Sequence, residues 1–215
     1  MTIKQVVKLA QAGELSNIAV KSNVDAIVGY INLGLIELYK RFPISVKEYV
    51  VELLDNVDVY TMPSDYMWLV NAYGEVPEDD LTSVVNLLAI NEEDNPLSIN
   101  TPSWNTVQIP LSVAGGYVSL IYVASPGIIE YTAPVAPATE GTYSVNGVSA
   151  TEIAIPVQMI EALLHYIGYR AHAAMDGNIQ AENSTHYTRF EKSCERIKEL
   201  GMMTSDDLSM YDRYS

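Results

Sequence analysis

The apolar positions in the last quarter of the chain recur every three or four residues, a spacing typical of amphipathic helices. A first helix is predicted from Pro156, because proline suits the first helical position. It should end at Asp176-Gly177, where glycine can adopt the left-handed backbone that closes a helix. A second helix is predicted to follow, so that Ile155 to Gly201 forms a helical hairpin. Its inward-facing positions are Met159, Ile160, Leu163, Leu164, Ile167, Ala171, Ala174, Met175, Tyr187, Phe190, Cys194, Ile197 and Leu200.

The opposite face of the second helix carries charges of both signs, which is typical of a face that meets water or another protein. Its members are Arg189, Glu191, Lys192, Glu195, Arg196, Lys198 and Glu199. Part of this face is a candidate for contact with another protein, which in an oligomer would be the neighbouring subunit. The candidate interface residues are Arg189, Lys192, Glu195, Arg196 and Glu199.

The pattern also predicts two helices at the N-terminus, at residues 2–12 and 24–41. The side-chain oxygen of Ser22 or Asn23 can accept a hydrogen bond from the first free N–H groups of the longer helix, and Pro43 ends it. Each of these helices has an apolar stripe that it cannot bury alone. We therefore expect them to pack against the C-terminal hairpin in an antiparallel bundle.

Between these helical regions the pattern changes to the alternation typical of strands. Residues 81–90 fit a helix or a strand equally well, and Asn146-Gly147 between valines predicts a tight hairpin turn. Extended segments are expected at residues 45–53, 57–62, 66–73, 106–111 and 117–124.

The predicted fold class is therefore α+β. An antiparallel helical bundle, made of the N-terminal helix and the C-terminal helical hairpin, occupies residues 1–43 and 155–201. Residues 44–154 form an inserted β-rich domain, and residues 202–215 form a C-terminal extension.

The charge is concentrated in the insertion. The whole chain has a formal net charge of -15, and residues 43–154 contain one basic residue, Lys47, against fifteen acidic ones. Nucleic-acid affinity comes mainly from lysine and arginine, so tight binding of phosphate by this region is disfavoured. The same acidity also fits a plain role in solubility.

The C-terminal extension is unusually apolar for a solvated end. We expect it either to become ordered against a partner protein or simply to fray. Its candidate partner-binding residues are Met202, Met203, Leu208, Met210, Tyr211, Arg213 and Tyr214.

Motifs for catalysis are missing: the sequence holds no phosphate-binding glycine-rich loop and no G-x-S-x-G elbow. His165 and His172 lie seven residues apart on one predicted helix, with Glu161 and Asp176 four residues outside them. They leave open a metal-binding helical-bundle enzyme, although the Glu-x-x-His pairs of four-helix di-iron proteins are absent. Cys194 is expected to be a small buried apolar residue. We predict no catalytic, cofactor-binding or metal-binding residue.

Membrane association is not expected either. The longest apolar runs fall short of the roughly 20 residues needed to cross a bilayer. The first apolar positions are interrupted by Lys4, Gln5, Lys8 and Gln11, unlike a signal peptide, so a cytosolic protein is expected.

Several segments together resemble the head-to-tail adaptor (connector) proteins of short-tailed bacteriophages. They are VDAIVGYINLGLIELYKRF, VDVYTMPSDYMWLVNAYG, NPLSINTPSWNTVQIP, VSLIYVASPG, IPVQMIEALLHYIGYRAHAAMDG and HYTRFEKSCERIKELG. The resemblance implies a ring, typically of twelve copies, between the portal and the tail nozzle or tail tube. It also implies that residues 202–215 reach into the portal protein and that the genome passes through the ring without specific binding. Such a protein is assembled in the host cytoplasm and resides in the neck of the virion. A soluble adaptor of a non-viral assembly is the remaining alternative.

Overall fold

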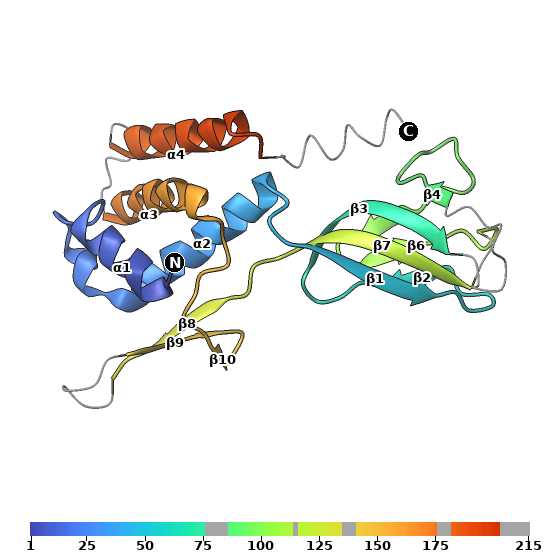
Figure 1. Ribbon diagram of the computed structural model, residues 1–215, viewed down its shortest axis with the longest axis horizontal. Helices are drawn as coiled ribbons and strands as arrows, with labels where there is room; N and C mark the ends of the chain where they lie inside the picture. Colours follow the sequence, from blue (N-terminus) through green and yellow to red (C-terminus); the bar gives the residue numbers. More distant parts are fainter. Residues whose placement is uncertain (76–85, 114–115, 135–140, 176–181, 203–215) are drawn as a thin grey trace. The chain divides into compact units, whose positions relative to one another are not determined.

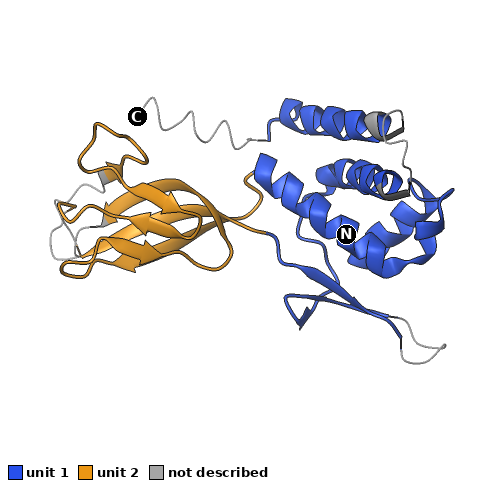
Figure 2. Ribbon diagram, turned by 180° about the vertical axis from the view of Figure 1, so that it is seen from behind, with its two compact units in different colours: residues 1–42, 126–204 blue, residues 43–125, 205–215 orange. Residues whose placement is uncertain are grey.

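The computed structural model describes residues 1–75, 86–113, 116–134, 141–175 and 182–202. The chain forms two compact units, coloured separately in Figure 2. Unit 1 combines Met1–Phe42 with Pro126–Thr204, and the described part of unit 2 is Pro43–Ser125. Each unit has its own layers and its own buried side chains.

Unit 1 is built around four α-helices. They are α1 (Ile3–Ala12), α2 (Val24–Arg41), α3 (Ile160–Met175) and α4 (Glu182–Glu199), with short 3-10 turns η1 (Ala19–Ser22) and η2 (Val157–Met159). The first helix begins at a capping box, in which Thr2 Oγ1 accepts from the Gln5 N–H and the Gln5 side chain accepts from the Thr2 N–H. Asn23 caps α2 by accepting from the Ala26 N–H at 3.1 Å. These local hydrogen bonds place the helix starts close to where the sequence predicts them.

The helices pack through a close approach of α2 and α3, and α3 in turn pairs with α4 (Figure 1). A Cβ atom at Gly34 would lie 2.5 Å from Leu163 Cδ1, so the two helices need a residue without a side chain there. The fully buried side chains of unit 1 include Ile3, Leu15, Ile27, Ile31, Leu38, Phe42, Met159, Leu163 and Phe190. This core holds the bundle together.

Unit 1 also contains a three-stranded antiparallel sheet. Its order is β10-β9-β8, with β8 (Ile129–Thr132), β9 (Thr142–Val145) and β10 (Val148–Ser149). The predicted hairpin turn is confirmed, because Asn146 and Gly147 have φ angles of 50° and 77°. Strand β8 packs against α2, where Asn32 Nδ2 donates to the Ile129 C=O and Asn32 Oδ1 accepts from the Ile129 N–H.

Unit 2 consists of two antiparallel sheets. The larger has the order β1-β7-β3-β4 and the smaller the order β2-β6-β5. Residues of both sheets share one buried cluster: Val51, Met62, Ala72, Leu88, Ile99, Val107, Ile109, Val118, Leu120, Tyr122 and Ala124. The strands are β1 (Val46–Glu52), β2 (Val59–Thr61), β3 (Tyr66–Glu75), β4 (Asn86–Leu88), β5 (Asn100–Ser103), β6 (Thr106–Gln108) and β7 (Tyr117–Ala124).

The pairing of β1 with β7 is regular along its whole length. The register runs from Val46 opposite Val123 to Glu52 opposite Tyr117 without a shift. Next to these ends, the Ala124 N–H donates to the Ser45 C=O at 2.8 Å. The pairing of β3 with β7 is interrupted by two register shifts. The chain therefore enters and leaves unit 2 along two bonded, adjacent segments.

The predicted fold class is wrong. Among the described residues, the chain is mixed and mostly β, with four α-helices and ten strands in three antiparallel sheets. It is not a helical bundle with an inserted β domain, since the sheet of β8, β9 and β10 belongs to the helical unit. The prediction failed because sequence order placed these strands beside the other strands, whereas their packing partner is α2.

Several predicted positions also differ. Of the predicted inward positions of α3, Leu163, Ile167 and Ala171 are buried, whereas Leu164 is only half-buried. Tyr187 and Leu200 were predicted to face inward but are exposed. Residues 86–88 form a strand, and residues 81–85 and the predicted helix end at residues 176–177 lie outside the described residues.

Candidate functional site: the outer face of helix α4

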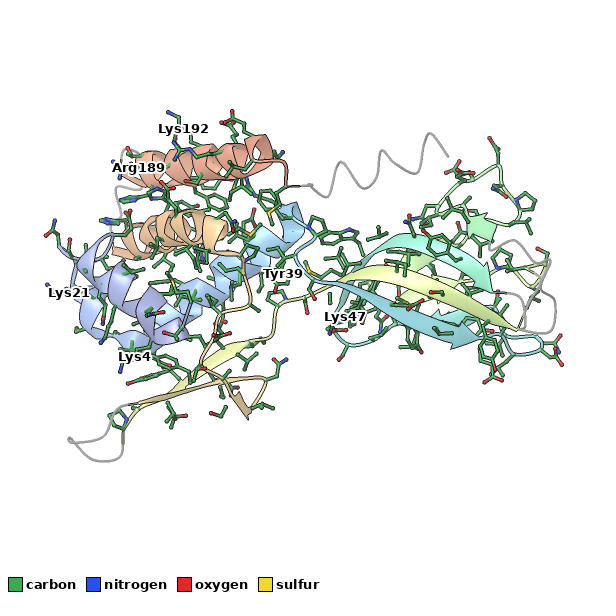
Figure 3. The ribbon with its side chains drawn as sticks, in the orientation of Figure 1. Lys4, Lys21, Tyr39, Lys47, Arg189 and Lys192 are labelled. Carbon is green, nitrogen blue, oxygen red and sulfur yellow. The ribbon has the colours of Figure 1, made fainter. Side chains whose placement is uncertain are left out.

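The charged face of α4 is exposed as the sequence predicts. Its members follow one another at three- and four-residue spacing, which places them on one side of a helix. Figure 3 shows Lys192 pointing away from the bundle. The exposed charged residues are Arg189, Lys192, Glu195, Arg196, Lys198 and Glu199. Whether they contact neighbouring subunits remains a prediction.

One ion pair lies on this surface. Arg196 Nη1 is 3.6 Å from Glu161 Oε2 on α3, and both side chains are more than half exposed. A pair so open to water contributes little to stability. The charges of this face are therefore still accessible to a partner.

A network of partly buried ion pairs and hydrogen bonds holds α4 against α2. Arg41 donates from Nη1 to Glu191 Oε2 at 2.7 Å and from Nη2 to Glu191 Oε1 at 2.8 Å, a bidentate pair. Its guanidinium also reaches Glu37 and lies 4.7 Å from the centre of the Phe190 ring. The hydrogen bonds from Arg41 lower the pKa of the Glu191 carboxyl, against the effect of burial. Glu191 is therefore paired with α2 while its side chain stays 37% exposed.

A second network anchors α3 and α4 to the loop after α1. His165 Nδ1 lies 3.1 Å from Glu14 Oε1, and the His172 and His186 rings stack with their centres 4.7 Å apart. His172 Nε2 donates to the backbone C=O of Glu14 at 3.3 Å, since a carbonyl can only accept. All three histidines of the chain thus converge on one glutamate.

Among the described residues, His186 is the member of this cluster whose buried ring nitrogen makes no hydrogen bond. Its Nδ1 lies 2.9 Å from Glu14 Oε2 but outside hydrogen-bonding geometry, so within the described residues this buried nitrogen has no hydrogen-bond partner. Burial lowers the pKa of His186, and the positive charges of His172, Arg189 and His165 act in the same direction, while Glu14 opposes them. Neutral His186 is therefore the form that the fold favours.

The cluster borders an open cavity of about 430 Å³, lined among others by Glu14, His172, His186 and Arg189. In the part of the chain that the structure describes, no group of three or more His, Cys, Asp or Glu residues is arranged to hold a metal ion. His165 and His172 instead bond to the loop after α1, which the spacing of the histidines could not indicate because Glu14 is about 150 residues away. Asp176 lies outside the described residues.

Cys194 faces the interior of unit 1 and is 2% exposed. Burial raises the pKa of its thiol to about 11, so the thiol is protonated at neutral pH. The expectation that this residue acts as a small buried apolar side chain is confirmed.

The end of α4 leads toward the predicted partner-binding segment. Gly201 has a φ angle of 85°, and its N–H donates to the Lys198 C=O, so the helix ends at the predicted glycine. Met202 is half-buried, and its N–H lies 3.4 Å from the Ile197 C=O. The remaining candidates of this segment lie outside the described residues: Met203, Leu208, Met210, Tyr211, Arg213 and Tyr214.

The single basic residue of unit 2 is already paired. Lys47 Nζ lies 2.5 Å from Asp65 Oδ2, and Asp65 also accepts from the Tyr122 hydroxyl at 3.0 Å. Burial, followed by the bond to Asp65, raises the pKa of Tyr122 to about 12. The surface of this unit therefore offers mainly carboxylates to a partner.

No helix among the described residues has the length and apolar character needed to span a membrane. The features that the described residues offer are exposed charged faces. Faces of this kind suit a protein of the assembly class, which acts by binding other proteins.

The family comparison agrees with this class. The family model described as SU10 adaptor protein matches residues 1–213, and a comparison with curated proteins gave no match. The chain belongs to the SU10 adaptor protein family. This family identifies it as a bacteriophage adaptor, a structural and non-enzymatic component of the virion that binds other phage structural proteins.

Proposed function

We propose that this adaptor joins the portal protein to the tail as a ring of identical subunits through which the genome passes. The observation that carries the proposal is the family match over residues 1–213. The exposed charged face of α4 and the apolar sequence of residues 202–215 supply the surfaces that such a role requires. In this proposal the protein resides in the neck of the virion and is assembled in the host cytoplasm.

The α4 face serves as one side of the subunit interface. A ring is built from heterologous contacts, in which one face of each copy meets a different face of the next. A face with both signs of charge sets the register of such a contact, because like charges disfavour wrong alignments. The bidentate contact with Arg41 and the stacking of His186 on His172 hold α4 against α2 and α3 for this purpose.

Residues 202–215 bind the portal protein, and the tail nozzle or tail-tube protein binds elsewhere on the ring. An apolar segment that becomes ordered on binding can cover a large surface of its partner. Its Met and Tyr side chains are types enriched at protein interfaces. The adaptor thus holds two partners through separate parts of one chain.

The acidic side chains of residues 43–154 allow DNA to pass without specific binding. Carboxylates that face a channel repel phosphate and keep the duplex from adhering to its wall. A reconstruction of the assembled particle by electron cryo-microscopy tests this point. Carboxylates of residues 43–154 that all point away from the channel would contradict it.

Mass measurement at increasing protein concentration tests the ring. We expect the purified chain to form a discrete oligomer, alone or after addition of the portal protein, with twelve copies as the expected number. A chain that stays monomeric at every concentration and does not bind the portal would contradict the proposal and favour an adaptor of another assembly.

A further inference from the structure

Strand β1 forms a free edge of the larger sheet of unit 2. Its neighbours in the chain show which backbone groups face outward. The Ala124 N–H donates to the Ser45 C=O, and the Leu53 N–H donates to the Gly116 C=O at 2.9 Å. Along an antiparallel pair of strands, every second residue directs its N–H and C=O toward the partner strand. Ser45 and Leu53 do so, and the odd-numbered residues between them therefore also face β7. Four residues therefore direct their N–H and C=O groups away from β7: Val46, Glu48, Val50 and Glu52.

The other sheet edges among the described residues are short, irregular or covered. β2 and β4 have three residues each and β10 has two, while β5 contains Pro102 and a register shift. The edge of β8 is covered by Asn32, whose side-chain amide bonds to both backbone groups of Ile129 in the manner of a neighbouring strand. Proteins protect sheet edges in these ways because an open edge recruits other strands. β1, with seven regularly paired residues, is the exception.

β1 also lacks two of the common forms of edge protection, proline and a bulge. Its lysine lies on the opposite face of the strand, bonded to Asp65. Val46 and Val50 are 50% and 47% exposed, which is a high value for valine in a sheet. Strand addition requires an open edge of this length, and the exposed side chains of β1 alternate between valine (Val46, Val50) and glutamate (Glu48, Glu52).

We propose that β1 is a docking edge to which an extended segment of a partner protein adds as a further strand, with basic residues alternating with apolar ones on one side. Each residue of the added strand would lie opposite one of β1 on the same face of the sheet. Lysine or arginine fits opposite Glu48 and Glu52, and apolar residues fit opposite Val46 and Val50.

Charge decides which segment fits. Unit 2 has one basic side chain, Lys47, and it is already paired, so the region around the edge is acidic. The C-terminal residues 203–215 of a second copy carry three aspartates and one arginine, and the two acidic surfaces would repel each other. The occupant is therefore a basic segment of another protein. This inference does not depend on the portal being a partner.

Two synthetic nine-residue peptides test the proposal on the full chain. In the first, Lys-Thr-Val-Thr-Lys-Thr-Val-Thr-Lys, one face of the extended peptide alternates lysine with valine; in the second, glutamate replaces each lysine. We expect the lysine peptide to bind at least tenfold more tightly by fluorescence anisotropy. It should also slow hydrogen exchange at the outward amides of Val46, Glu48, Val50 and Glu52. Equal binding of both peptides, no binding of either, or unchanged exchange at these amides would overturn the proposal.

Proline variants separate backbone pairing from general charge attraction. Val50→Pro removes one outward N–H without breaking a bond to β7 and should abolish binding of the lysine peptide. Val59→Pro is the matched control. The backbone C=O of Asp58 accepts from the Ile109 N–H and so faces β6, which means that the N–H of the next residue, Val59, points away from β6. The control should bind normally, and equal binding by both variants would contradict strand addition.

A charge variant tests the predicted chemistry of the partner without altering the edge. Glu52→Lys reverses one charge and leaves the backbone of β1 unchanged. It should therefore weaken binding of the lysine peptide and strengthen binding of the glutamate peptide. An unchanged preference would show that charge at this edge does not select the segment. Circular dichroism and thermal unfolding of each variant verify that the fold is retained.

Discussion

At the scale of the residue, Leu163 is a central contact of unit 1. It is fully buried, and its Cδ1 atom occupies the space that Gly34 leaves open between α2 and α3. A side chain in this position can neither be enlarged nor removed without a local rearrangement. Leu164, its neighbour in sequence, is half-buried and therefore buries less apolar surface in the core.

Leu163→Ala should reduce the free energy of unfolding by about 2 to 5 kcal/mol, because it removes buried contacts and leaves a cavity. Leu164→Ala should cost clearly less. Urea denaturation of both variants measures the difference. Equal losses would mean that the inner face of α3 is wrongly assigned.

His186 gives unit 1 a pH dependence. Burial, with the neighbouring positive charges, lowers its pKa below the ordinary value of 6.5, so the unfolded chain takes up a proton first as the pH falls. The contribution of His186 to the stability of the fold is therefore fully present above about pH 6.5 and decreases below it. His186→Gln should remove this contribution.

Thermal unfolding at pH 8 and pH 5.5 measures the effect of His186→Gln. The drop in melting temperature between the two pH values should be smaller in the variant by about 2 °C or more. The drop in the original chain should be unaffected by a chelator, because the cluster acts through protons. Identical drops in the two proteins would contradict the assignment.

Single residues also mark the limit of prediction from sequence. The burial of Cys194 and the cap at Asn23 follow from local patterns and are confirmed. The meeting of Glu14 with three histidines does not, because no local pattern joins residues that are so distant in the chain. The pairing of Glu191 with Arg41 does not follow either, since a helical pattern cannot show which polar position meets a side chain of another helix.

At the scale of the element, α4 combines two anchored sides with one charged outer face. The bidentate contact with Arg41 and the histidine cluster hold it from different directions. Substitutions on the outer face should therefore leave the helix in place. This separation allows the interface role of the face to be tested without unfolding.

Arg189→Glu combined with Lys192→Glu should retain the fold but lower the apparent affinity between subunits at least tenfold, because it reverses two exposed charges. The control is Lys8→Glu with Lys21→Glu, which changes the net charge equally on α1 and η1. Sedimentation velocity over a range of concentrations measures the association of both. Equal weakening would assign the effect to net charge rather than to α4.

The elements show the same division between local and distant information. The turn at Asn146 and Gly147 was predictable because two residues define its backbone. The membership of β8 in the helical unit was not, since it depends on its contact with Asn32 on α2. Strand patterns reveal which face is buried but not what buries it.

At the scale of the whole molecule, the proposed portal contact depends on residues beyond α4. Ending the chain after Met202 keeps the hydrogen bonds at Gly201 and Met202 that finish the helix. We expect this truncation to leave the melting temperature unchanged within about 1 °C.

The same truncation should abolish binding to the portal protein in a co-sedimentation assay. Oligomer formation through the α4 face should persist, which distinguishes the two contacts. Loss of folding would show that residues 203–215 belong to the core, and retained portal binding would place that contact elsewhere.

The hydrogen bond between Ala124 and Ser45 also has an evolutionary consequence. The chain enters and leaves unit 2 at two neighbouring points in space, so a gene segment encoding residues 43–125 is expected to be exchangeable by recombination with only two adjacent joints to rebuild. We therefore predict that relatives of this adaptor differ more in residues 43–125 than in the helical unit.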